Sequence, residues 1–119
     1  MKTRFTFYFL LTAFCVSSFI ATAQVNIWDS LALVDLYKST NGPNWRYSNN
    51  WLTAAPVPEW SGVYVSGNRV EEIMLSNDKL NGALPASLGN LTKLSYLDLS
   101  QNQLSGSIPA ELGNLANLV

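Results

Sequence analysis

The second half of this chain repeats itself with a period of 24 residues. One copy begins at Val70, the next at Leu94, and a third opens at Leu118. The apolar, glycine and proline positions recur at this offset in the pairs Leu75 and Leu99, Leu80 and Leu104, Gly82 and Gly106, Pro85 and Pro109, Leu88 and Leu112, and Leu91 and Leu115. A unit this short cannot bury its apolar face alone, so successive copies have to stack. The repeat therefore predicts a row of similar units packed side by side.

Each unit is predicted to start with a short strand. Side chains alternate between the two faces of a strand, so the spacing of Leu97 and Leu99 directs both leucines toward the interior of the unit. The residues beside and between them, Tyr96, Asp98 and Ser100, then point to the outer surface. Strands of successive units are expected to pair in parallel, about 4.8 Å apart.

The rest of each unit is predicted to turn back along its strand. Asn102 follows the strand, where its short amide can satisfy backbone groups that the turn leaves free. Gly106 permits backbone geometry that a side chain would forbid. Leu112 and Leu115 are three residues apart, which places them on one face of a short helical turn. The first copy has Asp78 in place of the asparagine, and because a carboxylate cannot donate hydrogen bonds, we expect that turn to be held less tightly.

The segment 97–109, which reads LDLSQNQLSGSIP, resembles the plant-type subfamily of leucine-rich repeats. It agrees with that subfamily at every diagnostic position. The first copy departs at Asp78 and at Met74, which stands where an aspartate is usual. The resemblance implies an α/β fold, a leucine-rich-repeat solenoid with short parallel strands. Solenoids of this kind bind partners along an extended concave surface.

A region of different composition, residues 24–69, precedes the repeats. A helix is predicted from Asp29, as its N-cap, to Lys38, because apolar residues recur at helical spacing. The glycine and proline of the segment 39–43 are expected to end it. Residues 60–70 are predicted to form a hairpin that leads into the first repeat. All four tryptophans lie in this region, at Trp28, Trp45, Trp51 and Trp60.

This tryptophan-rich region resembles the N-terminal cap of plant-type repeat proteins, and the resemblance of cap and repeats together covers residues 26–119. Family members commonly carry a cysteine on each side of the Trp-x-Gly-Val segment. Those positions here are Pro58 and Val65, so the family disulfide is absent, which favours a bacterial relative over a plant receptor. We expect the four tryptophans to form the core of the cap, since each covers a large apolar area. A sugar-stacking platform is the alternative.

Residues 1–23 have the layout of a secretory signal peptide. A short basic start precedes the apolar run 5–20, and Ala21-Thr22-Ala23 provides the small residues of a cleavage site. As a helix the run would reach about 24 Å, less than the roughly 30 Å of a bilayer core. A retained signal anchor is therefore the second choice. A lipoprotein with Cys15 as the lipidated residue is disfavoured because Phe14, rather than a small residue, precedes it.

The composition of the mature chain argues against catalysis. Five basic and eight acidic side chains remain after residue 23, a net charge of about −3 that gives no support for binding nucleic acid or anionic lipid. The chain has no histidine, which removes histidine-based catalysis and zinc ligation by histidine. Glu71 and Glu72 are adjacent, but strand neighbours point to opposite faces. We therefore predict that the chain is not an enzyme and has no cofactor and no metal site.

Recognition of a partner is the predicted function. The ligand is expected to be an extracellular protein or peptide bound on the concave face. The candidate residues are Glu72, Met74 and Ser76 of the first repeat with Tyr96, Asp98 and Ser100 of the second. Binding of carbohydrate or cell wall is one alternative, and the ectodomain of a longer receptor kinase-like or hydrolase-linked protein is another. The signal predicts a secreted or cell-surface protein, with membrane attachment expected only through an uncleaved signal or a downstream anchor.

The predicted organisation has three parts. Residues 1–23 form the signal, 24–69 the cap, and 70–119 the leucine-rich repeats, of which two are complete and the third is truncated. Because the sequence ends two residues into that third copy, we expect it to be a fragment of a longer protein.

Overall fold

The computed structural model describes residues 24–119, and the predicted signal peptide, 1–23, lies outside the described residues. The strands are β1 (Val63–Ser66), β2 (Arg69–Met74), β3 (Asn81–Gly82), β4 (Tyr96–Asp98) and β5 (Gln103–Leu104). The helical elements are the α-helix α2 (Ile27–Ser39) and four 3₁₀ helices, η1 (Gly42–Asn44), η2 (Val57–Glu59), η3 (Ala86–Asn90) and η4 (Ala110–Asn114).

The strands of the two repeats pair as the 24-residue offset predicts. β2 and β4 are parallel, with Ile73 opposite Leu97 and Met74 opposite Asp98. β1 adds to the other edge of β2 in an antiparallel hairpin, which gives the order β1-β2-β4. A second parallel pair, β3 with β5, joins the turns that follow the strands. The sequence did not predict this second pair, because two-residue strands leave no alternation to detect.

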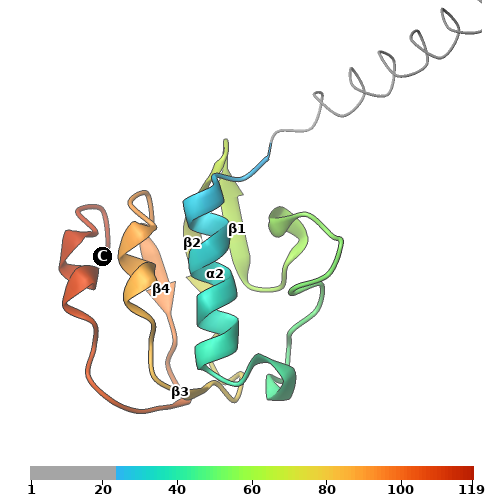
Figure 1. The fold of residues 1–119 in the computed structure, drawn as a ribbon, viewed down its shortest axis with the longest axis vertical. Coiled ribbons are helices and arrows are strands. Elements are labelled where there is room, and N and C mark those ends of the chain that lie inside the picture. The colour runs from blue at the N-terminus through green and yellow to red at the C-terminus, as the bar shows by residue number, and fades with distance from the viewer. Residues whose placement is uncertain (1–23) are drawn as a thin grey trace, which may run out of the picture.

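Three of the helical elements, α2, η3 and η4, stand in one row, and the three-stranded sheet lies behind them (Figure 1). α2 is followed by η3 and then by η4, and each of these segments contacts the next. The core lies between the row and the sheet. Its fully buried side chains include Leu33 and Leu36 of α2, Ile73 of β2, and Leu88 and Leu94 of the repeats. Leu97 and Leu99, which the repeat pattern predicts to point inward, pack against this core and are partly buried.

α2 begins one turn earlier than the sequence predicts. Its N-cap is Asn26, whose Oδ1 accepts a hydrogen bond from the backbone N–H of Trp28 at 2.9 Å. Asp29 is therefore not the cap. It lies in the first turn and is fully buried, where its carboxylate pairs with Arg69 of β2. Asn26 and Asp29 both have side chains that can cap a helix. Because Asp29 is held in the ion pair with Arg69, Asn26 is the residue that caps α2.

Three of the four tryptophans form the predicted cap core. The ring centroids of Trp45 and Trp51 are 4.8 Å apart, and those of Trp51 and Trp60 are 5.0 Å apart. Each indole N–H donates to a backbone carbonyl oxygen, so its polar end is satisfied inside the cap. The prediction is wrong for Trp28, which is 61% exposed on the surface of α2.

A bulge interrupts β2 at the adjacent glutamates Glu71 and Glu72. The register of β1 and β2 shifts, with Tyr64 opposite Glu72 but Val65 opposite Val70, so Glu71 is an extra residue in β2. Neither glutamate is buried, although the flanking Val70 and Ile73 both are. Burial therefore does not alternate along this part of β2.

Candidate binding sites

The outer face of the three-stranded sheet carries most of the residues predicted to bind a ligand. Pairing of β2 with β4 sets Glu72 beside Tyr96 and Met74 beside Asp98. Ser76 and Ser100 follow the two strands, where the N–H of Asn77 donates to the carbonyl oxygen of Ser100 at 2.9 Å. The structure thus brings the six predicted residues onto two adjacent repeats.

Tyr64 of β1 extends this face and was not among the predicted residues. Its register partner is Glu72, and Glu72 is in turn the partner of Tyr96. Register partners on neighbouring strands project to the same side of a sheet, so the three residues form a row across it. The two tyrosine side chains are 52% and 45% exposed. The apolar-polar alternation of Val63-Tyr64-Val65 was a usable signal, but the register that aligns it with Glu72 is not in the sequence.

The two acidic side chains of this face differ in what they contact. The Asp98 carboxylate accepts hydrogen bonds from the backbone N–H of Ser100 at 3.0 Å and from the Ser100 hydroxyl at 2.6 Å. These bonds lower the pKa of Asp98 below its ordinary value, and the bond from the Ser100 hydroxyl has the larger effect. Among residues 24–119, no hydrogen bond involves the Glu72 carboxylate. Asp98 therefore holds its own turn, whereas Glu72 is available to a partner.

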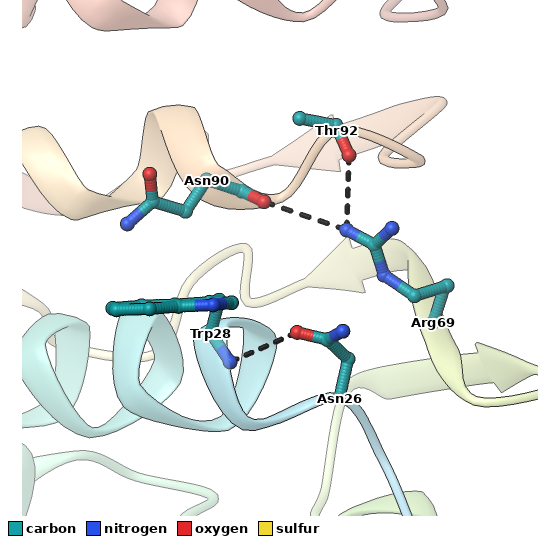
Figure 2. A pocket seen from close by; sticks show the side chains of 5 residues that line it. All are labelled: Asn26, Trp28, Arg69, Asn90 and Thr92. Carbon is teal, nitrogen blue, oxygen red and sulfur yellow. Dashed lines mark hydrogen bonds between the residues drawn. The ribbon is translucent and has the colours of Figure 1, made fainter.

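A second candidate site is a shallow pocket of about 400 Å³ where the first turn of α2 meets the first repeat. Its lining residues are Asn26, Trp28, Arg69, Asn90 and Thr92, as Figure 2 shows. None of these was predicted as a ligand contact, because they come from three segments that only the fold brings together. Trp28 was noted in the sequence, but as a residue of the cap core.

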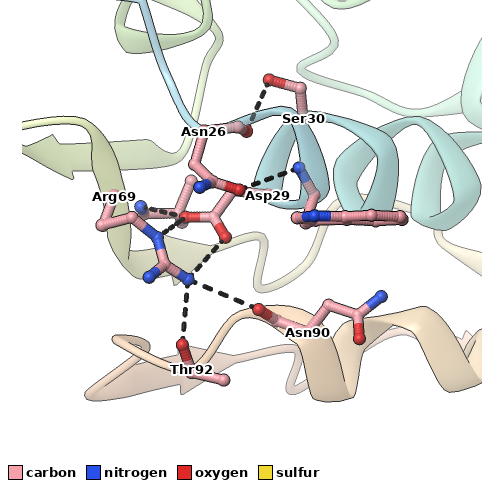
Figure 3. Close-up of polar contacts among 8 residues, drawn as sticks. Asn26, Asp29, Ser30, Arg69, Asn90 and Thr92 are labelled. Atoms are coloured by element: carbon pink, nitrogen blue, oxygen red, sulfur yellow. Dashed lines mark hydrogen bonds and ion pairs between the residues drawn. The ribbon is translucent and has the colours of Figure 1, made fainter.

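Arg69 forms hydrogen bonds with several polar groups around this pocket (Figure 3). Its Nε and Nη2 donate to the two carboxylate oxygens of Asp29, both at 2.9 Å. Nη2 also donates to the Thr92 hydroxyl oxygen at 2.9 Å. The hydrogen bond with Asp29 raises the pKa of Arg69, so the guanidinium stays charged. The ion pair joins α2 to β2, and the hydrogen bond to Thr92 joins both to the segment that follows η3.

Residues 24–119 contain no group of three or more histidine, cysteine, aspartate or glutamate side chains placed to hold a metal ion. No helix among them combines the length and the apolar character needed to cross a membrane.

Comparison with known proteins finds a match within the repeat region. Residues 93–115 match the family described as Leucine Rich Repeat. Phytosulfokine receptor 2 of Arabidopsis thaliana is 40% identical over 60 residues, which are 47% of this chain and 6% of the receptor. The chain thus spans a small part of that relative.

Two solved structures share the fold. One is the leucine-rich-repeat ectodomain of the Arabidopsis thaliana receptor kinase GASSHO1/SCHENGEN3 in complex with CASPARIAN STRIP INTEGRITY FACTOR 2. It is 28% identical with a TM-score of 0.63, over 76% of this chain and 11% of that one. The other is a leucine-rich repeat protein from Bacteroides eggerthii, 32% identical with a TM-score of 0.53, over 60% of this chain and 12% of that one. These likenesses support leucine-rich repeats of the plant type in this chain.

Proposed function

We propose that this chain is a non-enzymatic recognition module, which binds an extended segment of an extracellular protein or peptide on the outer face of its three-stranded sheet. The observation that carries the proposal is the row of Tyr64, Glu72 and Tyr96, which crosses all three strands with both tyrosines exposed. The receptor kinase ectodomain that shares the fold was solved in complex with CASPARIAN STRIP INTEGRITY FACTOR 2, which supports the binding of a partner by repeats of this kind.

The wider setting belongs to the same proposal. The parallel pairing of β2 with β4 and of β3 with β5 supports the start of a solenoid whose sheet face is concave. Residues 1–23 would act as a secretory signal, 24–69 as the cap and 70–119 as repeats, in a secreted or cell-surface protein. The missing family cysteines and the likeness to the Bacteroides eggerthii protein support a bacterial member.

The chemistry of the row indicates which ligand side chain would bind there. Glu72 lies between Tyr64 and Tyr96, and its carboxylate makes no hydrogen bond within the described residues. A lysine or arginine side chain could pair with the carboxylate while its cation and apolar stem lie against the rings. The flanking Met74 supplies an adaptable apolar contact on the same face. We therefore expect the bound segment to present a basic residue at the centre of the row.

Selection from a displayed random peptide library tests this proposal. We expect enriched peptides to carry a central lysine or arginine and to bind Glu72→Gln about tenfold more weakly in isothermal titration calorimetry. Glu71→Gln is the matched control, because it removes the same charge from the neighbouring residue, which lies outside the row. Peptides that bind Glu72→Gln and Tyr96→Ala as tightly as the original chain would show that the ligand uses another surface.

A further inference from the structure

The pocket between α2 and the first repeat exposes one flat aromatic side chain. Trp28 is 61% exposed, whereas the other three tryptophans are at most 7% exposed. Its backbone is fixed by the N-cap bond to Asn26, and its ring lies between α2 and the side chain of Asn90 (Figure 2). The indole N–H makes no hydrogen bond among residues 24–119, unlike that of each buried tryptophan. The pocket thus offers an apolar ring face with a free donor at its edge.

Several polar groups around this ring have unused hydrogen-bonding capacity. The side-chain amide of Asn90 has no partner among the described residues, so it can both donate and accept. The Thr92 hydroxyl oxygen accepts from Arg69, which leaves its hydrogen available to donate. Asn26 uses only its Oδ1 in the N-cap bond, which leaves two amide hydrogens. These groups line the same pocket as Trp28.

The electrostatics of the pocket disfavour an anion. The positive charge of Arg69 is already matched by the Asp29 carboxylate, which is fully buried and bonded to two guanidinium nitrogens. The Nη1 of Arg69 makes no hydrogen bond among residues 24–119, but a carboxylate or phosphate ligand there would also meet the negative charge of Asp29 beside the same guanidinium. A neutral ligand rich in hydroxyl groups meets no such repulsion.

We propose that this pocket binds one ring of a neutral saccharide. The apolar C–H face of a pyranose stacks on the Trp28 ring, and its hydroxyl groups exchange hydrogen bonds with Asn90, Thr92 and Asn26. The volume of about 400 Å³ lies within the roughly 300–1,000 Å³ of small-molecule pockets. The site is separate from the sheet face, so it stands independently of peptide recognition there.

Titration of neutral hexasaccharides into the full chain tests the proposal. The probes are cellohexaose, chitohexaose, laminarihexaose and maltohexaose, with hexagalacturonate as the acidic comparison. The chain is produced in a bacterial host so that the Asn90-Leu91-Thr92 sequon stays unmodified. Because Trp28 is the exposed indole, a bound ring should shift its fluorescence and protect it from acrylamide quenching. Calorimetry gives the affinity.

At least one neutral hexasaccharide is expected to bind, and Trp28→Ala to weaken it by about tenfold or more. Trp28→Phe, which keeps a ring, should lose less. The matched control is Leu31→Ala, an exposed apolar residue of the same helix that does not line the pocket. Circular dichroism verifies that each variant is folded. Failure of every neutral probe at millimolar concentration, binding of hexagalacturonate alone, or undiminished binding by Trp28→Ala would each overturn the proposal.

Discussion

Asp78 occupies the position at which the second repeat has Asn102, and the two side chains meet different partners. Asn102 donates to the carbonyl oxygens of Leu75 at 2.7 Å and Leu99 at 2.9 Å, and its Oδ1 accepts from the N–H groups of Asp78 and Leu80. Asp78 is buried, with its Oδ1 accepting from the backbone N–H of Tyr47. Its Oδ2 has no partner among the described residues. The first repeat therefore carries a buried carboxylate that is half satisfied.

Asp78→Asn is expected to stabilise the fold at neutral pH. Burial raises the pKa of Asp78 above its ordinary value of 3.8, against the opposing effect of its backbone hydrogen bonds. The folded state then binds more protons than the unfolded state, so the contribution of Asp78 to stability is greatest below pH 3.8 and falls as pH rises through the folded pKa. Removing the charge should add about 1 kcal/mol at pH 7, or about 4–8 °C in Tm, and less at pH 3.

Thermal unfolding monitored by circular dichroism at both pH values measures this effect. Asn102→Asp is the reciprocal control, since it removes the hydrogen bonds that the Asn102 amide donates to Leu75, Leu99 and Ser100 and should lower Tm. The pH dependence of the stability that Asp98 contributes has the opposite sign. Its pKa is lowered in the folded state, so its contribution is lost as pH falls below 3.8. A lower Tm for Asp78→Asn at pH 7 would mean that the carboxylate holds the turn as a charged acceptor.

At the level of the elements, η3 and η4 approach each other at a glycine. A Cβ placed on Gly89 would lie 2.7 Å from both the Cβ and the carbonyl oxygen of Glu111, which is closer than real Cβ atoms approach other atoms. Gly113 holds the equivalent position one repeat later, and a Cβ there would meet nothing within 4 Å. The glycine of the first Leu-Gly-Asn-Leu segment is thus explained by the packing of the second repeat against it.

Gly89→Ala is expected to destabilise the chain by about 1–3 kcal/mol, because η4 would have to move away from η3. Gly113→Ala makes the same chemical change where there is space, so it should be neutral or slightly stabilising. Urea unfolding of the two variants side by side measures the difference. Equal effects of the two substitutions would show that the close approach of the helical turns does not limit packing.

The sequence predicts the repeat elements better than the elements around them. The spacing of Leu97 and Leu99 predicts the inward face of β4, since both side chains pack against the core. The start of α2 and the exposure of Trp28 could not be predicted from local sequence. Asp29 is buried in an ion pair with Arg69, which is 40 residues away, so it does not cap the helix. Local patterns determine local structure, whereas a long-range ion pair depends on the finished fold.

Prediction of the candidate sites is limited in the same way, because contacts between distant residues are not visible in local sequence patterns. The outward positions of Tyr96 and Asp98 follow from strand alternation in the second repeat. Tyr64 joins Glu72 only through the register of the hairpin, which includes the extra residue Glu71. The Trp28 pocket depends on residues from α2, β2 and the end of η3, and no short motif connects them.

For the molecule as a whole, the ladder between repeats continues past the second copy. The N–H of Ser95 donates to the carbonyl oxygen of Glu71 at 2.8 Å, and the N–H of Val119 donates to the carbonyl oxygen of Ser95 at 3.1 Å. Each bond joins residues 24 apart, so the second repeats the first. Leu115 is already buried, while Ile108 is 76% exposed. The outer side of the second repeat therefore has both the backbone groups and the apolar surface that a further unit would cover.

Insertion of a second copy of residues 94–117 after Asn117 is expected to stabilise the chain cooperatively. Leu97, Leu99 and Leu104 are only partly buried, and a stacked unit would cover their remaining apolar surface. Full burial of a leucine contributes about 1.5–3 kcal/mol, so three partial burials should outweigh the ordering of one near-identical unit. In urea the midpoint should rise and the m-value should increase by roughly a quarter, in proportion to the added surface. A separate second transition would show that the copies fold without sharing a core, because stacked repeats gain their stability from the interface between neighbours.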